Sequence, residues 1–274
     1  MSFPATLFFW PWAISPTAQT VRPKIIGLSL TTTEYYDENE DPENASRNGV
    51  SGLFGAAANG AEVSNITLEN VTVDIVSTTS YNYIAPLIAF VEGCDVINCH
   101  VTGLNYHVAV SDENGMYTSL GGLISGIWVG TVQDCSVDGN MNVELITNNT
   151  HSGDNFIGGL LGDGYVGVDG NTVNVDIVVK YINNCQADYE RPDGNPSGME
   201  LVYAAGFQKL LIGGLAGQSN TATNCLAKGN VTLQIESPVD NTLVACDALC
   251  GVLLDVSEAA AAGSEGTGTV NVNK

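Results

Sequence analysis

A short apolar core recurs six times along this chain, and a leucine holds its second position in five of the copies. Successive second positions lie 34 to 37 residues apart, except for an interval of 55 residues between Leu160 and Leu215. A fixed period of this length is typical of stacked supersecondary units, none of which can bury its apolar face alone. The cores are Gly52-Leu53-Phe54-Gly55, Pro86-Leu87-Ile88-Ala89, Gly122-Leu123-Ile124-Ser125, Gly159-Leu160-Leu161-Gly162, Gly214-Leu215-Ala216-Gly217 and Gly251-Val252-Leu253-Leu254.

A second block follows five of the cores and has the pattern of a strand. In it an Asn or Asp precedes an apolar residue, and apolar and polar residues then alternate with period two, which indicates one buried face. A third alternating segment rich in Val, Ile and Thr comes next, as in Met141–Leu145. Between them, Gly139-Asn140 and Gly229-Asn230 suit turn positions with positive φ. The second blocks are Ser64–Leu68, Ile97–Val101, Gln133–Val137, Asn183–Ala187 and Thr223–Ala227.

Three strands per repeat, stacked in register, predict an all-β fold. We expect a right-handed parallel β-helix of about six coils. A β-sandwich also has many short strands, but it gives no reason for a fixed period. Only Gly198–Leu211 carries anything like a helical stripe. The predicted organisation is an N-terminal cap over residues 1–48, a solenoid over 49–256 with an insertion at 187–210, and a tail over 257–274 in which Thr269–Val272 begins another strand.

The repeat also predicts which residues form columns in the core. We expect one column of Leu53, Leu87, Leu123, Leu160 and Leu215. A second column would hold Cys99, Cys135 and Cys225, with Cys185 nearly in the same place. Stacked side chains run parallel and do not face one another, which favours buried free thiols over disulfides. Local pairs that could oxidise outside the cell are Cys94 with Cys99 and Cys246 with Cys250. The sequence contains no CxxC pair, so it gives no indication of a zinc site.

The repeats resemble the GLUG motif of bacterial and archaeal surface proteins. The resemblance is clearest in Gly121–Ile124 with Asp134–Asn140, and in Gly213–Gly217 with Asn224–Val231. It covers about residues 50–255, although the Leu87 repeat lacks the leading glycines and the Val252 repeat is partial. Such motifs occur in adhesin-like proteins and in non-catalytic parts of immunoglobulin A peptidases. The resemblance therefore implies a secreted stalk or adhesive module, and it assigns no catalytic residue.

Composition limits the partners of the chain. Thirty acidic and eight basic residues give a formal net charge of −22, which disfavours nucleic acid and anionic membranes because phosphate binding depends on Lys and Arg. No run of 18 apolar residues indicates a membrane span. Residues 1–18 could be a signal peptide, although no basic residue precedes the apolar run, or Phe8, Trp10 and Trp12 could pack on the first coil as a cap.

Acidic clusters offer weak candidates for a metal site. Asp37, Asn39 and Asp41 alternate as calcium ligands do, but Pro42 and Asn48 stand where an EF-hand loop has its glycine and closing glutamate. We therefore predict a solvated linker, no metal site and no cofactor, with calcium as the remaining possibility. Asp163, Asp169 and Asp193 lie beside glycines and are expected to form turns.

The insertion is the most function-like segment. Long excursions from a rigid scaffold often carry binding sites, and Tyr189, Arg191, Tyr203 and Phe207 are residue types that anchor recognition. Covering one flank of the coil is the competing interpretation. Further aromatic residues are Tyr81, Tyr83 and Tyr106.

These features predict a non-catalytic, extracellular or cell-surface adhesin module or stalk. Its partners would be cell-surface glycans or proteins, with end-to-end self-association as a further possibility because an open coil end exposes sheet edges. The alternative is a polysaccharide lyase or hydrolase, by analogy of fold alone. His100, His107 and His151 form no ligand motif, and His100 should point outward if Cys99 and Val101 point inward. A spacer without a ligand is a third interpretation.

Overall fold

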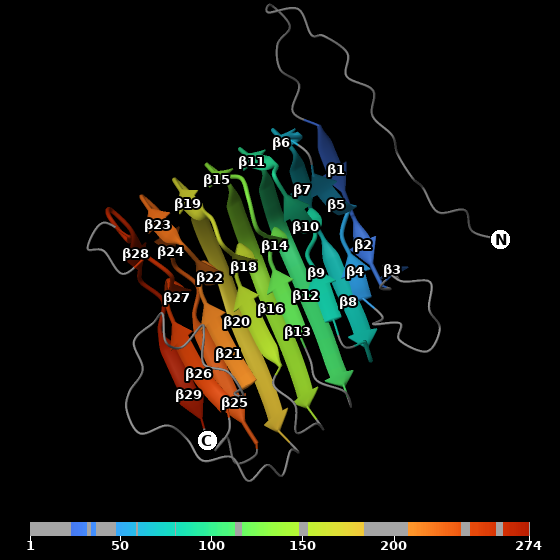
Figure 1. Cartoon of the computed structure of the whole chain (residues 1–274), viewed down its shortest axis with the longest axis vertical. Coiled ribbons are helices and arrows are strands. Elements are labelled where there is room, and N and C mark those ends of the chain that lie inside the picture. Colours follow the sequence, from blue (N-terminus) through green and yellow to red (C-terminus); the bar gives the residue numbers. More distant parts are fainter. Residues whose placement is uncertain are drawn as a thin grey trace, which may run out of the picture.

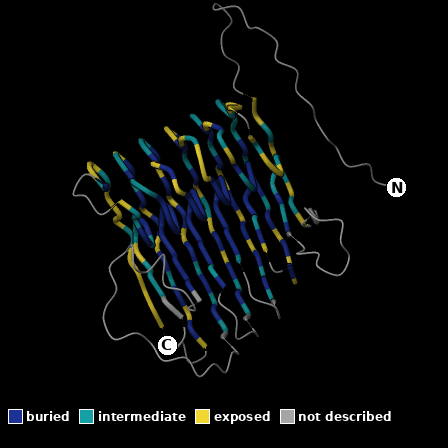
Figure 2. The backbone as a smooth tube through the Cα atoms, viewed as in Figure 1, coloured by how far each residue is buried: buried dark blue, intermediate teal, exposed yellow. Residues whose placement is uncertain are grey.

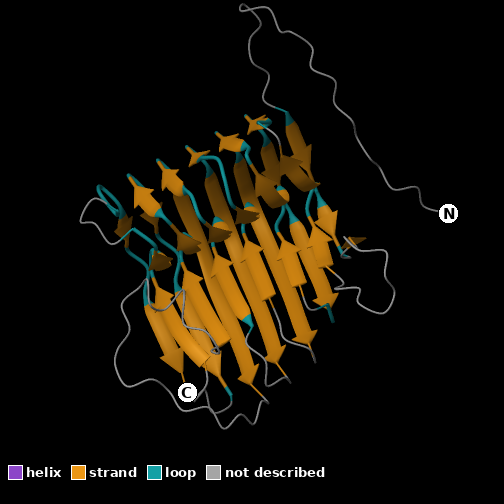
Figure 3. Ribbon diagram, in the orientation of Figure 1, coloured by secondary structure: helices purple, strands orange, loops and turns teal. Residues whose placement is uncertain are grey.

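The structure is a right-handed β-solenoid built from four parallel sheets, and none of the described residues is helical (Figures 1 and 3). This computed structural model describes residues 23–31, 34–36, 48–58, 60–79, 81–112, 117–147, 153–183, 208–236, 242–255 and 260–273. Each turn of the chain contributes strands to sheets B, C, D and A in that order. The predicted fold class is therefore confirmed.

The four sheets, here named A to D, differ in the number of their strands. Sheet A has eleven strands: β1 (Lys24–Ile26), β2 (Ser29–Leu30), β7 (Thr67–Glu69), β8 (Thr72–Ser77), β12 (His100–Asp112), β16 (Ser136–Thr147), β20 (Thr172–Asn183), β24 (Leu226–Ala227), β25 (Val231–Ile235), β28 (Glu265–Gly266) and β29 (Val270–Asn273). Sheet B has seven: β3 (Glu34–Tyr36), β4 (Asn48–Ser51), β9 (Tyr81–Ile84), β13 (Tyr117–Gly121), β17 (Asp154–Gly158), β21 (Gln208–Gly213) and β26 (Thr242–Asp247). Sheet C has six: β5 (Phe54–Ala58), β10 (Ile88–Glu92), β14 (Ile124–Ile127), β18 (Leu161–Gly164), β22 (Ala216–Ser219) and β27 (Cys250–Leu253). Sheet D has five: β6 (Glu62–Ser64), β11 (Asp95–Ile97), β15 (Val132–Gln133), β19 (Gly167–Asp169) and β23 (Thr221–Thr223).

Among the described strands, every pairing is parallel except that of β3 with β4. In the predicted N-terminal cap, β1 and β2 pair with β7 and β8 and extend sheet A. In the predicted tail, β28 and β29 pair with β24 and β25, which confirms the strand predicted near Val270. Residues 208–211, at the end of the segment with a helical stripe, belong to β21.

The predicted leucine column is confirmed for all five residues, but the sixth core, at Val252, was placed wrongly. From Leu87 onward, the backbone N–H of each column leucine donates to the carbonyl of the column residue in the next coil, as in Leu123 to Leu160 at 3.0 Å and Leu160 to Leu215 at 2.8 Å, whereas the Leu53 N–H donates to the Pro86 carbonyl at 3.0 Å. Leu215 continues the series by donating to Leu249 at 2.7 Å, whereas Val252 pairs with Gln218 three positions later. Leu53 to Leu249 therefore spans five complete turns, and the last interval is 34 residues.

Paired glycines explain how the chain bends between sheets B and C. A Cβ at Gly121, or at its equivalents in the next coils, Gly158 and Gly213, would overlap the carbonyl oxygen three residues later. A Cβ at the following glycine, such as Gly122, would overlap a carbonyl of the next coil, here that of Gly159. The first glycine therefore permits the bend, and the second lets successive coils come within hydrogen-bonding distance.

The cysteine column is confirmed for three residues and corrected at the fourth. The Cys135 N–H donates to Asn171 Oδ1 at 2.8 Å, and the neighbouring Thr172 pairs with Ser136, so Asn171 fills the place expected for Cys185. The second block of that coil is therefore Asp169–Val173, and Asn183 instead ends β20. Cys185 lies outside the described residues. The six described cysteines are free thiols: Cys94, Cys99, Cys135, Cys225, Cys246 and Cys250.

The polar residue before this column has a conformational role. Asn65, Asn98, Asp134 and Asn224 have φ between 52° and 60°, the left-handed region that Asn and Asp tolerate better than other residues with side chains. Gly170 supplies the same conformation with φ of 67°. Two glycines were predicted from sequence to have a positive φ. Gly139 does, with φ of 147°, whereas Gly229 does not.

The apolar columns form one continuous interior along the stack (Figure 2). We expect Leu160→Ala to lower the free energy of unfolding by about 2–5 kcal/mol, because the side chain is fully buried and its loss leaves a cavity in that interior. Val76→Ala is the control, since Val76 is 76% exposed and should change stability by about 0.5 kcal/mol or less. Urea unfolding followed by circular dichroism measures both, and equal shifts would contradict a shared core at Leu160.

Candidate binding site on the outer face of sheets B and C

Sheets B and C bury side chains on both of their faces. In β17 and β21, Ile157 and Ile212 enter the main core, while Phe156 and Leu211 join Val252 in a second, smaller cluster. The bend brings the outer faces of the two sheets together. Ser119 and Ser125 show this contact directly, because each hydroxyl donates to the other residue's carbonyl at 2.6 Å. We call these outer side chains the B–C face.

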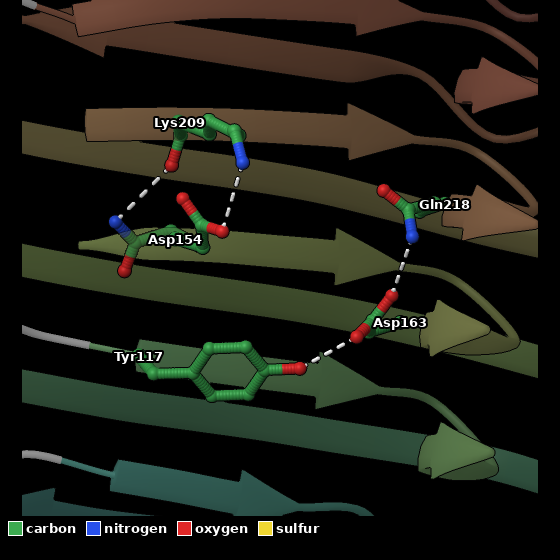
Figure 4. A network of polar contacts seen from close by, with 6 residues as sticks. Tyr117, Asp154, Asp163, Lys209 and Gln218 are labelled. Atoms are coloured by element: carbon green, nitrogen blue, oxygen red, sulfur yellow. Dashed lines mark hydrogen bonds and ion pairs between the residues drawn. The ribbon is translucent and has the colours of Figure 1, made fainter. Parts of the chain in front are cut away.

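A buried carboxylate lies at the centre of the B–C face. Tyr117 donates its hydroxyl hydrogen to Asp163 Oδ2 at 2.5 Å, and Gln218 Nε2 donates to Asp163 Oδ1 at 3.0 Å (Figure 4). These residues come from β13, β18 and β22 in three successive coils. Asp163 is 2% exposed. The prediction that Asp163 forms a turn was wrong, because it lies within β18.

Burial governs the protonation of this group. Desolvation raises the pKa of Asp163 to about 6, although the hydrogen bond from Tyr117 opposes the rise. The neighbouring Asp154 carboxylate adds to the rise, and Lys209 opposes it. Burial also raises the pKa of Tyr117, so this phenol stays protonated as a donor.

An ion pair lies beside the carboxylate. Lys209 Nζ is 3.0 Å from Asp154 Oδ2, and the Lys209 carbonyl accepts a hydrogen bond from Asn155 Nδ2 at 3.3 Å (Figure 4). Burial raises the pKa of Asp154, and the Lys209 ammonium counters part of that rise. Among the described residues, the buried side-chain oxygens without a hydrogen-bond partner are Asn155 Oδ1 and Gln218 Oε1.

Aromatic rings surround Tyr117 on the same face. Its ring centroid lies 6.1 Å from that of Tyr81, 5.4 Å from Tyr83 and 5.6 Å from Phe156. Tyr83 contacts Phe90 at 5.5 Å, edge to face. Most rings of this aromatic set are half-buried, and Tyr81 is a more exposed member, at 41%.

The aromatic set reaches the loop after β14. Trp128 meets Phe90 edge to face, with centroids 5.1 Å apart. Trp128 is 47% exposed, and Tyr165 in the next coil is 41% exposed. Chemically, such a face can stack against a ligand and offer hydrogen bonds, while its carboxylate has both oxygens bonded within the protein.

Most residues predicted to bind a ligand fall outside the described residues. These are Tyr189, Arg191, Tyr203 and Phe207 of the insertion, the calcium candidates Asp37, Asn39 and Asp41, and also His151 and Asp193. Those predictions therefore stay predictions. The predicted insertion, 187–210, follows β20, and its last three residues, 208–210, belong to β21. Within the described part of the chain, no group of three or more His, Cys, Asp or Glu residues is placed to hold a metal ion.

Other predicted residues are placed by the structure. Tyr81 and Tyr83 belong to the B–C face, whereas Tyr106 is fully buried in the main core and donates to the Ile84 carbonyl at 3.0 Å. His100 points away from the core, as expected, and its ring nitrogens lie 2.8 Å from Ser136 Oγ and 2.9 Å from Asn98 Oδ1. None of the described residues lies in a helix of the length and hydropathy that crossing a bilayer requires.

Sequence reasoning missed Trp128, Tyr117, Asp163 and Gln218. The ring contacts and side-chain hydrogen bonds of these residues join positions 34 to 55 residues apart in sequence, from Tyr83 with Tyr117 to Asp163 with Gln218, so only the coil register and the bend bring them together. The repeat period could have indicated that Tyr117 lies beside Tyr81, because the two residues are 36 apart in sequence and fall in the same column.

The comparisons with known proteins give no relative. No family model, no curated protein and no solved structure matches the chain. The resemblance to GLUG repeats therefore stays a prediction.

The raised pKa of Asp163 predicts that the protein loses stability as pH rises through the titration of this group. A carboxyl whose folded pKa, about 6, exceeds its ordinary 3.8 contributes most stability below pH 3.8, and that contribution is lost as pH rises to 6. Relative to Asp163→Asn, the wild-type free energy of unfolding should fall by on the order of 3 kcal/mol between these limits. Urea titrations at pH 4 to 7 measure it, with Asp138→Asn as an exposed control. A difference between wild type and Asp163→Asn that stays constant with pH would exclude this role of burial.

Proposed function

We propose that this chain is a non-catalytic secreted or cell-surface β-solenoid that serves as an adhesin module or stalk and binds glycans or a surface protein. The observation that carries the proposal is the aromatic B–C face on the side of the stack. Partly exposed rings there pack against half-buried rings, as Trp128 does against Phe90, and rigid aromatic side chains are common anchors of recognition. The resemblance to surface-protein repeats supports the same interpretation.

A rigid scaffold suits this role. Each coil is hydrogen-bonded to its neighbours through all four sheets, so side chains on the flank keep fixed positions without ligand-induced ordering. The acidic balance, with a net charge of −22, directs the proposal toward neutral or basic partners, since like charges repel at short range.

Binding of the full chain to immobilised glycans and to surface-protein extracts tests the proposal. We expect saturable binding to at least one class, and it should weaken when Tyr81 and Trp128 are both replaced by Ala. A heat-unfolded sample is the control for adsorption by exposed apolar residues. Absence of saturable binding to both classes would refute the adhesin role and leave a spacer.

The alternative is a carbohydrate-active enzyme, and one observation favours it. Asp163 interacts electrostatically with Asp154, burial raises the pKa of both carboxyl groups, that of Asp163 to about 6, and a raised carboxyl pKa is typical of a general acid. Its near-complete burial weighs against substrate access. Release of reducing ends or unsaturated sugars from polysaccharides, lost in Asp163→Asn, would establish the enzyme instead.

A further inference from the structure

We infer, resting on the proposed function, that Trp128 and Tyr165 form a stacking platform for a neutral glycan chain that runs along the solenoid axis. The two residues hold the same place in adjacent coils. Ile127 pairs with Gly164 in sheet C, and each aromatic residue directly follows one of them. The Tyr165 N–H also donates to the Ile127 carbonyl at 3.1 Å. Their backbones are therefore one coil apart, about 4.8 Å along the axis.

The platform is both supported and accessible. Phe90 lies edge to face against Trp128, with an interplanar angle of 88°, and belongs to the previous coil of sheet C. Even so, Trp128 is 47% exposed and the adjacent Val129 60% exposed. A large apolar ring that is held by packing yet open to solvent loses little entropy when it binds, which is the property of a good anchor.

The column positions directly before and after the platform are polar. Glu92 precedes Trp128 by one coil, and Asn220 follows Tyr165 by one coil, where its Nδ2 donates to the Tyr165 carbonyl at 2.5 Å. An axial ligand would thus meet a carboxylate, two aromatic rings and an amide in succession. Sugar chains present alternating C–H faces and hydroxyl groups, and a pyranose with its linking oxygen extends by about the rise of one coil.

Charge selects among glycans. Glu92 is exposed, Asp163 is buried on the B–C face and accepts a hydrogen bond from Tyr117, and the ammonium group of Lys209 is ion-paired with Asp154. A uronic-acid or sulfated glycan would approach carboxylates without a free cationic partner among these residues, which costs Coulomb energy. A basic peptide would be attracted, but Glu92 is the single exposed carboxylate in the described part of this column, so we favour a neutral glycan.

Isothermal titration calorimetry of the full chain tests the inference. The probes are cellohexaose and N-acetylchitohexaose, each with its disaccharide and tetrasaccharide, together with polygalacturonate and a lysine-rich peptide. We expect at least one neutral hexaose to bind, with affinity rising from the disaccharide to the tetrasaccharide as the chain extends over more coils. Trp128→Ala and Tyr165→Ala should each weaken that binding by about tenfold or more, and Trp128→Phe should retain most of it.

Val76→Ala, on the exposed face of sheet A, is the matched control and should leave binding unchanged. Because Trp128 is partly exposed, circular dichroism should show that its variants remain folded. The inference is wrong if the neutral sugars do not bind, if both aromatic variants bind as wild type does, or if polygalacturonate or the peptide binds more tightly. Retained binding to glycans or proteins in the broader screen, with any of these results, would leave the proposed function intact.

Discussion

Backbone hydrogen bonding between successive coils is the constraint on which the rest of the structure depends. The donor at each leucine position reaches a carbonyl in the next coil, and the strands of all four sheets repeat this contact. Parallel pairing places equivalent residues of adjacent coils about 4.8 Å apart, so each position becomes a column. The consequence is that the surroundings of a side chain depend mainly on its two column neighbours, and only secondarily on its neighbours in sequence.

The sequence was sufficient to predict the columns but not every register. Leu53 to Leu215 were predicted correctly because leucine recurs there in the same short apolar core, with a glycine before it in four of the five copies. The last repeat was assigned three residues too late, since Leu249 follows Ala248 and no glycine pair marks it. Asn171 was overlooked because it is not a cysteine, yet its side chain accepts the same backbone N–H. Small side chains with an acceptor are interchangeable there, as Cys135 and Ser264 show by accepting from Cys99 and Cys225.

The B–C face could not be predicted, for a different physical reason. Its contacts depend on the direction in which the chain turns at Gly121 and its equivalents, and composition does not encode that direction. Gly126 is part of the same arrangement: a Cβ there would lie 3.4 Å from the Tyr83 ring, so its absence gives that ring room beside sheet C. The aromatic set was visible as residue types, but its grouping required the bend.

Column stacking also explains how an acidic chain can form such an assembly. Like charges stacked about 4.8 Å apart would repel, and the described acidic residues often have an amide or a base as neighbour. Asn174 Nδ2 donates to Asp138 Oδ1 at 2.7 Å, and Lys180 Nζ lies 3.4 Å from Glu144 Oε1.

Asp169 follows the same rule, and hydrogen bonds from Thr223 and Asn224 lower its pKa. Glu62 beside Asp95 departs from it, but there Thr131 donates to Asp95 at 2.9 Å. Asp163 is the buried instance, with Gly126 in the preceding coil and Gln218 donating from the next. Its carboxylate therefore obeys the column rule of the exposed acids, and what distinguishes it is the outer packing of sheets B and C, which removes the water that would otherwise keep its pKa low.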